Sequence, residues 1–105
     1  MSKTKTISEL TNLIAIALRH RIGSIVNENE IYSQKYARDA EVLMNEARKI
    51  SAKENWNIYD KKKIAGKSRK KLRLELESKP FLNEEKFKIL DRELNRALKE
   101  LGLLD

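Results

Sequence analysis

The chain has 105 residues, no cysteine and a net charge of +7, which fits one small domain and excludes a disulfide framework or a thiolate metal site. Charged residues make up 37% of the chain, but the 40% that is hydrophobic recurs in periodic stripes, which excludes complete disorder. With only three glycines and one proline, the chain lacks the turns of an all-β fold. We therefore expect a single all-α domain, a small bundle of about four helices.

The first predicted helix covers residues 8–22. Apolar residues recur there at three- and four-residue steps, the spacing of one buried helix face: Ile7, Leu10, Ile14, Ala17, Leu18, Ile22 and Ile25. Thr6 and Glu9 have the spacing of a capping box at its start, which leaves residues 1–5 outside the helix, and we expect these to be disordered. Gly23 is expected to kink the helix or to end it.

A second helix is predicted from about Glu30 to Ser51, after a polar connection at residues 27–30. Its apolar residues step by four and three, which indicates a heptad seam: Tyr36, Ala40, Leu43, Ala47 and Ile50. The small alanines of this seam would let a neighbouring helix approach closely. Because no proline separates the first two segments, one continuous helix over residues 8–50 is the alternative.

Residues 51–60 are predicted to form a loop that contains Trp56. A third, basic helix follows, with one apolar stripe: Ile64, Ser68, Leu72 and Leu76. Gly66 leaves its start open between the beginning of the basic segment and Ser68. The alternating leucines over residues 72–76 would also fit a strand, but a lone strand has nothing with which to pair.

Lys79-Pro80 ends the third helix, since the residue before a proline is disfavoured in the helical region. Asn83 is expected to cap a last, continuous helix with a second heptad seam: Phe87, Leu90, Leu94, Ala97 and Leu101. Gly102 follows as its C-terminal cap residue. Together the apolar faces predict a core that includes Leu10, Ile14, Leu18, Ile25, Tyr36, Leu43, Ala47, Phe87, Leu90, Leu94 and Leu101.

The excess of positive charge lies in one segment, Lys61–Arg73. This segment holds eight basic residues and no acid, whereas the rest of the chain sums to −1. A concentrated excess is a local electrostatic footprint, which is typical of surfaces that contact phosphates. Two aromatic residues just upstream would be able to stack on exposed bases. The candidate contact residues are Lys61, Lys62, Lys63, Lys67, Arg69, Lys70, Lys71, Arg73, Trp56 and Tyr59.

These residues predict an accessory subunit that binds DNA or RNA, within a replication, repair or ribonucleoprotein complex. Little sequence specificity is expected, because no base-reading motif is present. Two other interpretations of the basic segment stay open: it docks on an acidic partner protein, or it is an inert solvated face, with the two aromatics serving as core anchors. The heptad seams also allow a protein–protein module that binds a larger partner or forms a homodimer.

No motif indicates catalysis. His20 is the only histidine, and the string from Leu18 to Arg21 is similar to the phosphoacceptor helix of histidine kinases. An arginine follows the histidine where that family has an acid, so we expect a surface histidine rather than a general base or phosphoacceptor. Gly66-Lys67-Ser68 matches the tail of a phosphate-binding loop but lacks the upstream glycine. We expect a non-enzyme without metal, cofactor or small-molecule substrate.

The location of the protein is also predicted by its apolar runs. The longest of them, Leu13–Leu18, is far shorter than the roughly 20 residues that span a bilayer. Residues 1–7 are polar and lack the apolar run of a signal peptide. We therefore expect a soluble, cytoplasmic protein that binds no membrane.

Overall fold

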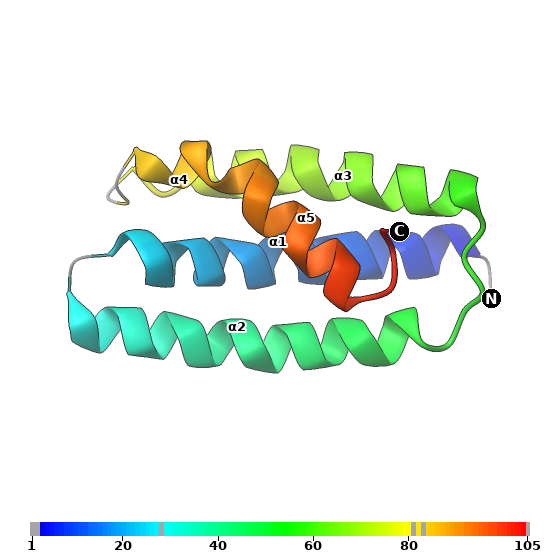
Figure 1. The fold of residues 1–105 in the computed structure, drawn as a ribbon, viewed down its shortest axis with the longest axis horizontal. Coiled ribbons are helices and arrows are strands. Elements are labelled where there is room, and N and C mark those ends of the chain that lie inside the picture. Colours follow the sequence, from blue (N-terminus) through cyan, green and yellow to red (C-terminus); the bar gives the residue numbers. More distant parts are fainter. Residues whose placement is uncertain (1–2, 28, 81, 83, 105) are drawn as a thin grey trace.

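The computed structural model describes residues 3–27, 29–80, 82 and 84–104, which form five helices (Figure 1). These are α1 (Lys3–Val26), α2 (Glu30–Ser51), α3 (Ile58–Glu77), α4 (Glu85–Lys88) and α5 (Leu90–Glu100). The predicted all-α bundle is confirmed. The described residues include no strand, so the strand alternative for residues 72–76 is wrong. None of the helices within these ranges is both long and apolar enough to cross a bilayer.

Helix α1 begins earlier than its sequence predicts. It starts at Lys3, so Thr6 lies inside the helix and the predicted capping box with Glu9 is wrong. Residues 3–5, which were expected to be disordered, are helical, while residues 1–2 lie outside the described part. The reason is a tertiary contact: Lys3 Nζ donates to the Asn55 carbonyl at 2.7 Å and lies 2.8 Å from the Asp60 carboxylate.

Gly23 neither kinks nor ends α1, which continues to Val26. A Cβ at this position would lie 3.3 Å from Cδ2 of Tyr36, so the glycine lets the tyrosine ring of α2 lie against the α1 backbone. The chain then reverses, and the Asn29 side chain caps α2 by accepting from the backbone N–H groups of Ile31 and Tyr32. The two-helix prediction is confirmed, and the continuous helix over 8–50 is wrong.

Helix α3 begins ten residues before the late start at Ser68 that Gly66 suggested. Asn57 caps it, and a capping box with Asp60 satisfies backbone N–H groups in both directions. The connection after α2 is therefore shorter than the predicted loop over residues 51–60. Gly66 lies in the middle of α3, where a Cβ would meet no atom within 4 Å.

The last predicted helix is divided into two. Ile89, with φ −99° and ψ 0°, separates the short α4 from α5. Lys86 of α4 is buried, and its Nζ donates to the Lys79 carbonyl at 2.8 Å, which ties α4 to the end of α3. The predicted cap residue Asn83 lies outside the described residues. Gly102 ends α5 as expected, with φ 72°.

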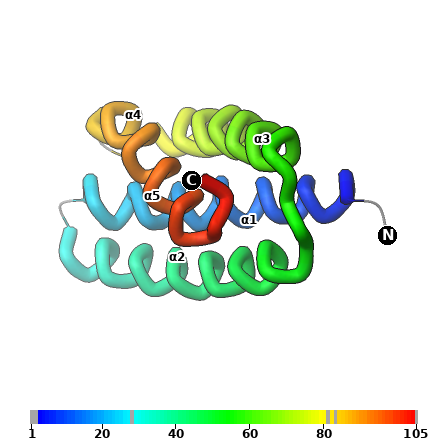
Figure 2. The backbone as a smooth tube through the Cα atoms, turned by 45° about the vertical axis from the view of Figure 1, so that its right-hand side comes forward, coloured from blue at the N-terminus to red at the C-terminus, as the bar shows by residue number. Residues whose placement is uncertain are grey.

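The helices form one layer with α5 lying across it. Helix α1 is central and packs against both α2 and α3, which do not contact each other within the described ranges. Helix α5 runs obliquely over one face of α1 (Figures 1 and 2). Between them lies a core that α1, α2, α3 and α5 all supply: Leu10, Ile14, Leu18, Ile22, Met44, Ala47, Ile64, Leu72, Leu76, Leu94, Ala97 and Leu98.

Most of the predicted core residues are buried, but those at the margins are not. Ile25 is 48% exposed because it lies in the last turn of α1, so its assignment to the core is wrong. Tyr36, Leu43 and Phe87 are half-buried at the edges of the core. Ala40 and Ala47 are buried on the side of α2 that faces α1, where their small side chains permit close packing.

Candidate nucleic-acid interface

The basic segment lies within α3, which packs one face against the core. Ile64, Ser68, Leu72 and Leu76 are all fully buried, so one face of the helix is turned inward. The positions on the other side, which carry most of the basic residues, therefore point to solvent. The amphipathic helix predicted for this segment is confirmed.

The structure divides the eight basic residues into two groups. Five lysines are exposed and make no ion pair within the part of the chain that is described. We call this group the lysine face: Lys62, Lys63, Lys67, Lys70 and Lys71. Both arginines are instead paired with carboxylates, and Lys61 is half-buried beside the end of α5.

Arg69 is neutralised across the helix interface. Its Nε donates to Asp91 Oδ1 at 2.8 Å, and a second nitrogen donates to Oδ2 at 3.3 Å, a forked arrangement. The hydrogen bonds from Arg69 lower the pKa of the Asp91 carboxyl, and the same pair raises the pKa of Arg69. Arg69 therefore attaches α3 to α5 and contributes little net charge to the surface.

Arg73 is also engaged. Its Nε lies 3.3 Å from Glu77 one turn later, and its guanidinium lies 5.7 Å from the centre of the Phe87 ring. Glu77 belongs to α3 and Phe87 belongs to α4, so Arg73, like Arg69, is engaged in contacts within the bundle.

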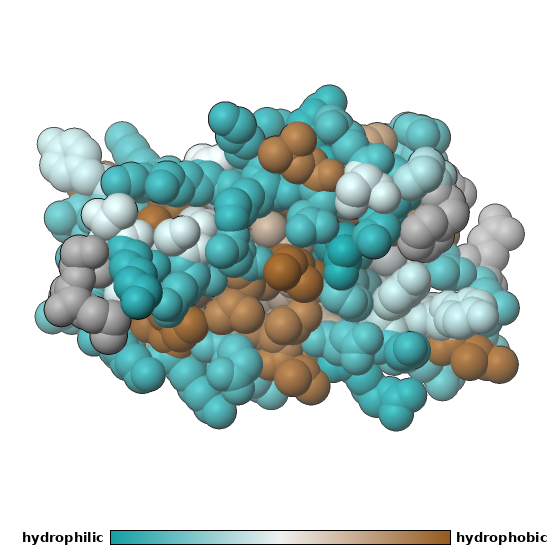
Figure 3. Space-filling model, turned by 180° about the vertical axis from the view of Figure 1, so that it is seen from behind, coloured by the Kyte–Doolittle hydropathy of each residue, from teal (hydrophilic) through white to brown (hydrophobic). Residues whose placement is uncertain are grey.

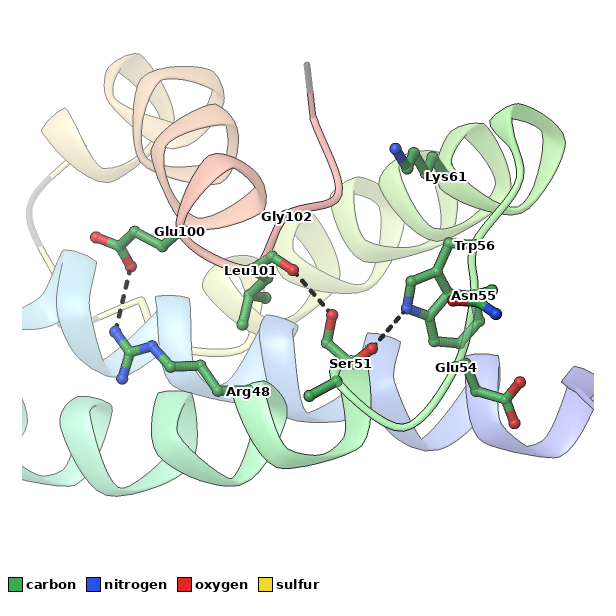
Figure 4. Close-up of a pocket in the computed structure, with 10 residues that line it drawn as sticks. Arg48, Ser51, Glu54, Asn55, Trp56, Lys61, Glu100, Leu101 and Gly102 are labelled. Atoms are coloured by element: carbon green, nitrogen blue, oxygen red, sulfur yellow. Dashed lines mark hydrogen bonds and ion pairs between the residues drawn. The ribbon is translucent and has the colours of Figure 1, made fainter.

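The two aromatic candidates differ in exposure. The Trp56 indole N–H donates to the Ser51 carbonyl at 2.9 Å, Lys3 Nζ lies 5.6 Å from its ring, and its side chain packs against the core (Figure 4). Trp56 is thus a loop anchor, and only a rearrangement would let it stack on a base. Tyr59 is 78% exposed in the first turn of α3, on the side that carries Lys63 and Lys70.

A hollow near these residues is open and mixed in charge. It has a volume of about 460 Å³ and lies between the ends of α2 and α5 (Figure 4). Arg48, Lys61, Glu54 and Glu100 line it, with Arg48 and Glu100 paired at 3.9 Å, while the Ser51 hydroxyl donates to the Leu101 carbonyl at 2.9 Å. The described residues contain no group of three histidines, aspartates or glutamates that could hold a metal ion.

His20 lies away from the lysine face and is half-buried. Its Nδ1 lies 2.8 Å from the Ile16 carbonyl, an acceptor only, so Nδ1 carries a proton. Its ring packs edge-on against Tyr36, with centroids 5.8 Å apart. The predicted surface histidine is therefore partly enclosed between α1 and α2.

No protein-family model, curated protein or solved structure matches the chain. The sequence located the basic segment, but it did not reveal which cations are paired, because Asp91 is 22 residues from Arg69.

Proposed function

We propose that the protein is a non-enzymatic subunit that binds nucleic acid by contacting phosphates through the lysine face of α3. The observation that carries this proposal is that five exposed lysines share one helix and have no ion-pair partner among the described residues. Unpaired ammonium groups repel one another, and a polyanion relieves this repulsion while releasing its own counterions.

The chemistry of the lysine face predicts affinity without sequence preference. Lysine acts as a point charge, and the two arginines, whose guanidinium groups are able to fork onto a base edge, are already bound to carboxylates. Exposed Tyr59 offers one stacking surface beside Lys63, which favours single strands. We place such a subunit within a larger replication, repair or ribonucleoprotein assembly.

The test is a titration of labelled single- and double-stranded DNA and RNA, followed by fluorescence anisotropy at about 50 and 200 mM salt. If all five lysines neutralise phosphates of a duplex, affinity should fall roughly 500-fold between these two concentrations, from a salt slope of about −4.5. Trp56 emission should change little, since the indole is anchored to Ser51.

A charge-matched pair of variants separates the lysine face from net charge. Lys63, Lys67 and Lys70→Glu should abolish most binding and reduce the salt slope by about 3. The control replaces three exposed lysines elsewhere, Lys35, Lys53 and Lys99→Glu, which lowers the net charge equally. An equal loss of nucleic-acid affinity in both variants would mean that binding depends on net charge alone. Unchanged affinity in the first variant would rule out the lysine face as the binding surface.

A further inference from the structure

The side of α1 that faces away from α5 is left open. Leu13, Ile16 and His20 recur there at three- and four-residue steps, away from the buried stripe of α1, and all three are half-buried. Figure 3, which views the molecule from behind, shows hydrophobic surface gathered in the middle of this side, with the mostly hydrophilic surface of α3 above it. No described helix covers this stretch of α1.

The open side is bordered by α2 and α3 and is hollowed where α1 meets α3. On the α3 side, Asn12 and Ile16 of α1 face Lys71 and Leu74 across a hollow of about 320 Å³. On the α2 side, Tyr36, Leu43 and Ile50 recur every seven residues along one edge, and Tyr36 packs on Gly23 of α1. We call this concavity the α1 groove, with Leu13 and Ile16 as its floor.

The two walls of the α1 groove differ in charge. The α3 wall carries Lys67 and Lys71, which are exposed and have no ion pair within the described residues. Glu75, the carboxylate of this wall, forms an ion pair with Arg19, whose Nη1 lies 3.4 Å from Oε2 of Glu75. Further along, Lys79 lines a second hollow with Arg19 and His20. The border with α3 is therefore basic, whereas Leu43 and Ile50 make the opposite edge largely apolar.

We infer that the α1 groove binds an amphipathic helix of a partner protein, with an apolar stripe on the floor and carboxylates along the edge that faces α3. Helix α1 alone lies between α2 and α3 among the described helices, so a helix laid along the hollowed side would complete a bundle around α1. This inference shares Lys67 and Lys71 with the lysine face but not Leu13 or Ile16, so a substitution at Ile16 separates it from nucleic-acid binding.

The probe is a labelled synthetic peptide about 20 residues long, since shorter helices are marginal in water, with leucines at three- and four-residue steps and glutamates along one edge. A twin peptide carries lysines in place of those glutamates. The full-length protein should bind the glutamate peptide at least about tenfold more tightly than its twin, because the twin places like charges together. Similar binding of both peptides would overturn the charge complementarity, and absence of binding would overturn the groove.

Variants locate the binding on the protein. Ile16→Asp places a charge on the apolar floor and should weaken binding by at least about tenfold, whereas Ile31→Asp, at a 78% exposed position in the first turn of α2, should leave it unchanged. Helicity and nucleic-acid affinity of both variants should match the parent. Equal effects of the two substitutions would contradict the inference.

A charge swap tests the same wall without touching the core. Lys67 and Lys71→Glu should reverse the preference, so that the lysine peptide binds more tightly than the glutamate peptide. An unchanged preference would overturn the proposed orientation. Sedimentation equilibrium provides the remaining outcome: a dimer of the free protein that Ile16→Asp converts to a monomer would assign the groove to self-association instead.

Discussion

Gly66 and Gly23 both lie inside helices, and a methyl group added at each would meet different surroundings. At Gly66 it would enter open space on α3, while at Gly23 it would lie 3.3 Å from the Tyr36 ring. Glycine costs a helix interior roughly 0.5–1 kcal/mol relative to alanine, through the backbone freedom lost on folding. The surroundings of each glycine therefore decide how much of this cost a substitution by alanine removes.

We predict that Gly66→Ala raises the free energy of unfolding by about 0.5–1 kcal/mol. Gly23→Ala should yield a smaller gain or a loss, because the Tyr36 ring must move to admit the methyl group. Urea denaturation of the parent and both variants measures the difference. Equal gains at the two positions would show that the packing of Tyr36 on the α1 backbone is unimportant to stability.

The contribution of Asp60 to the stability of the fold depends on pH, and the contacts of its carboxylate explain why. The hydrogen bond from Lys3 is the largest influence that lowers the pKa of Asp60, and the backbone N–H of Asn57 adds to it. Because the pKa is lower in the folded state, the unfolded chain takes up the proton first as the pH falls. The stability that Asp60 contributes is present above the usual aspartate pKa of about 3.9 and is lost below it.

Asp60→Asn should therefore destabilise the protein at pH 6 and have progressively less effect as the pH falls below about 4. The amide keeps an acceptor for the Asn57 N–H but cannot attract Lys3. Chemical denaturation of both proteins between pH 6 and pH 3 gives the comparison. A constant difference across this range would mean that the ionised carboxylate is not what stabilises the start of α3.

At the level of whole helices, the sequence is most informative where the determinants are local. The α2 seam and the asparagines before it predicted that helix correctly, since periodicity and capping act within a few residues. The early start of α3 is also indicated by the sequence, because Asn57 and Asp60 have the spacing of a capping box. Gly66 suggests a later start instead. An interior glycine lowers helix stability without ending the helix when tertiary burial continues on either side.

The break between α4 and α5 has no such local signal. The residues from Phe87 to Leu101 fit one heptad seam, yet Ile89 leaves the helix so that α5 can cross α1. The buried Lys86 amine bonds to a carbonyl of the preceding connection, and Arg69 reaches Asp91 across the bundle. These contacts depend on how the chain folds back on itself, so neither the break nor the pairing of Arg69 with Asp91 could be predicted, whereas Arg73 and Glu77 have the local spacing of an i,i+4 pair.

At the scale of the whole molecule, α1 is the element on which the others depend. It packs against each of the other four helices, whereas the backbone of α2 lies close to α1 alone among the described helices, and α2 reaches the end of α5 only through the side chains of Arg48 and Ser51. The sequence shows that α1 has a broad apolar surface, but it cannot show which part α5 covers and which part stays open. The α1 groove is thus a property of the assembled layer rather than of any one segment.

This arrangement predicts that the bundle unfolds as one unit and that the packing of α1 determines its stability. Leu18→Ala removes a fully buried side chain of α1 and should lower the free energy of unfolding by about 2–5 kcal/mol. Leu74→Ala, at a 57% exposed position of α3, is the matched control and should change it by less than about 1 kcal/mol.

Two probes distinguish this behaviour from separate unfolding of the helices. Trp56, the single tryptophan, lies where α2 passes to α3 and is bonded to Ser51, so its emission reports on that end of the bundle, while circular dichroism reports on all helices. Because α2 and α3 are held together chiefly through α1, the two transitions should coincide in the parent and shift together in Leu18→Ala. If the Trp56 transition separated from the loss of helicity, α3 or the connection before it would be an independent unit, and the central role of α1 would be wrong.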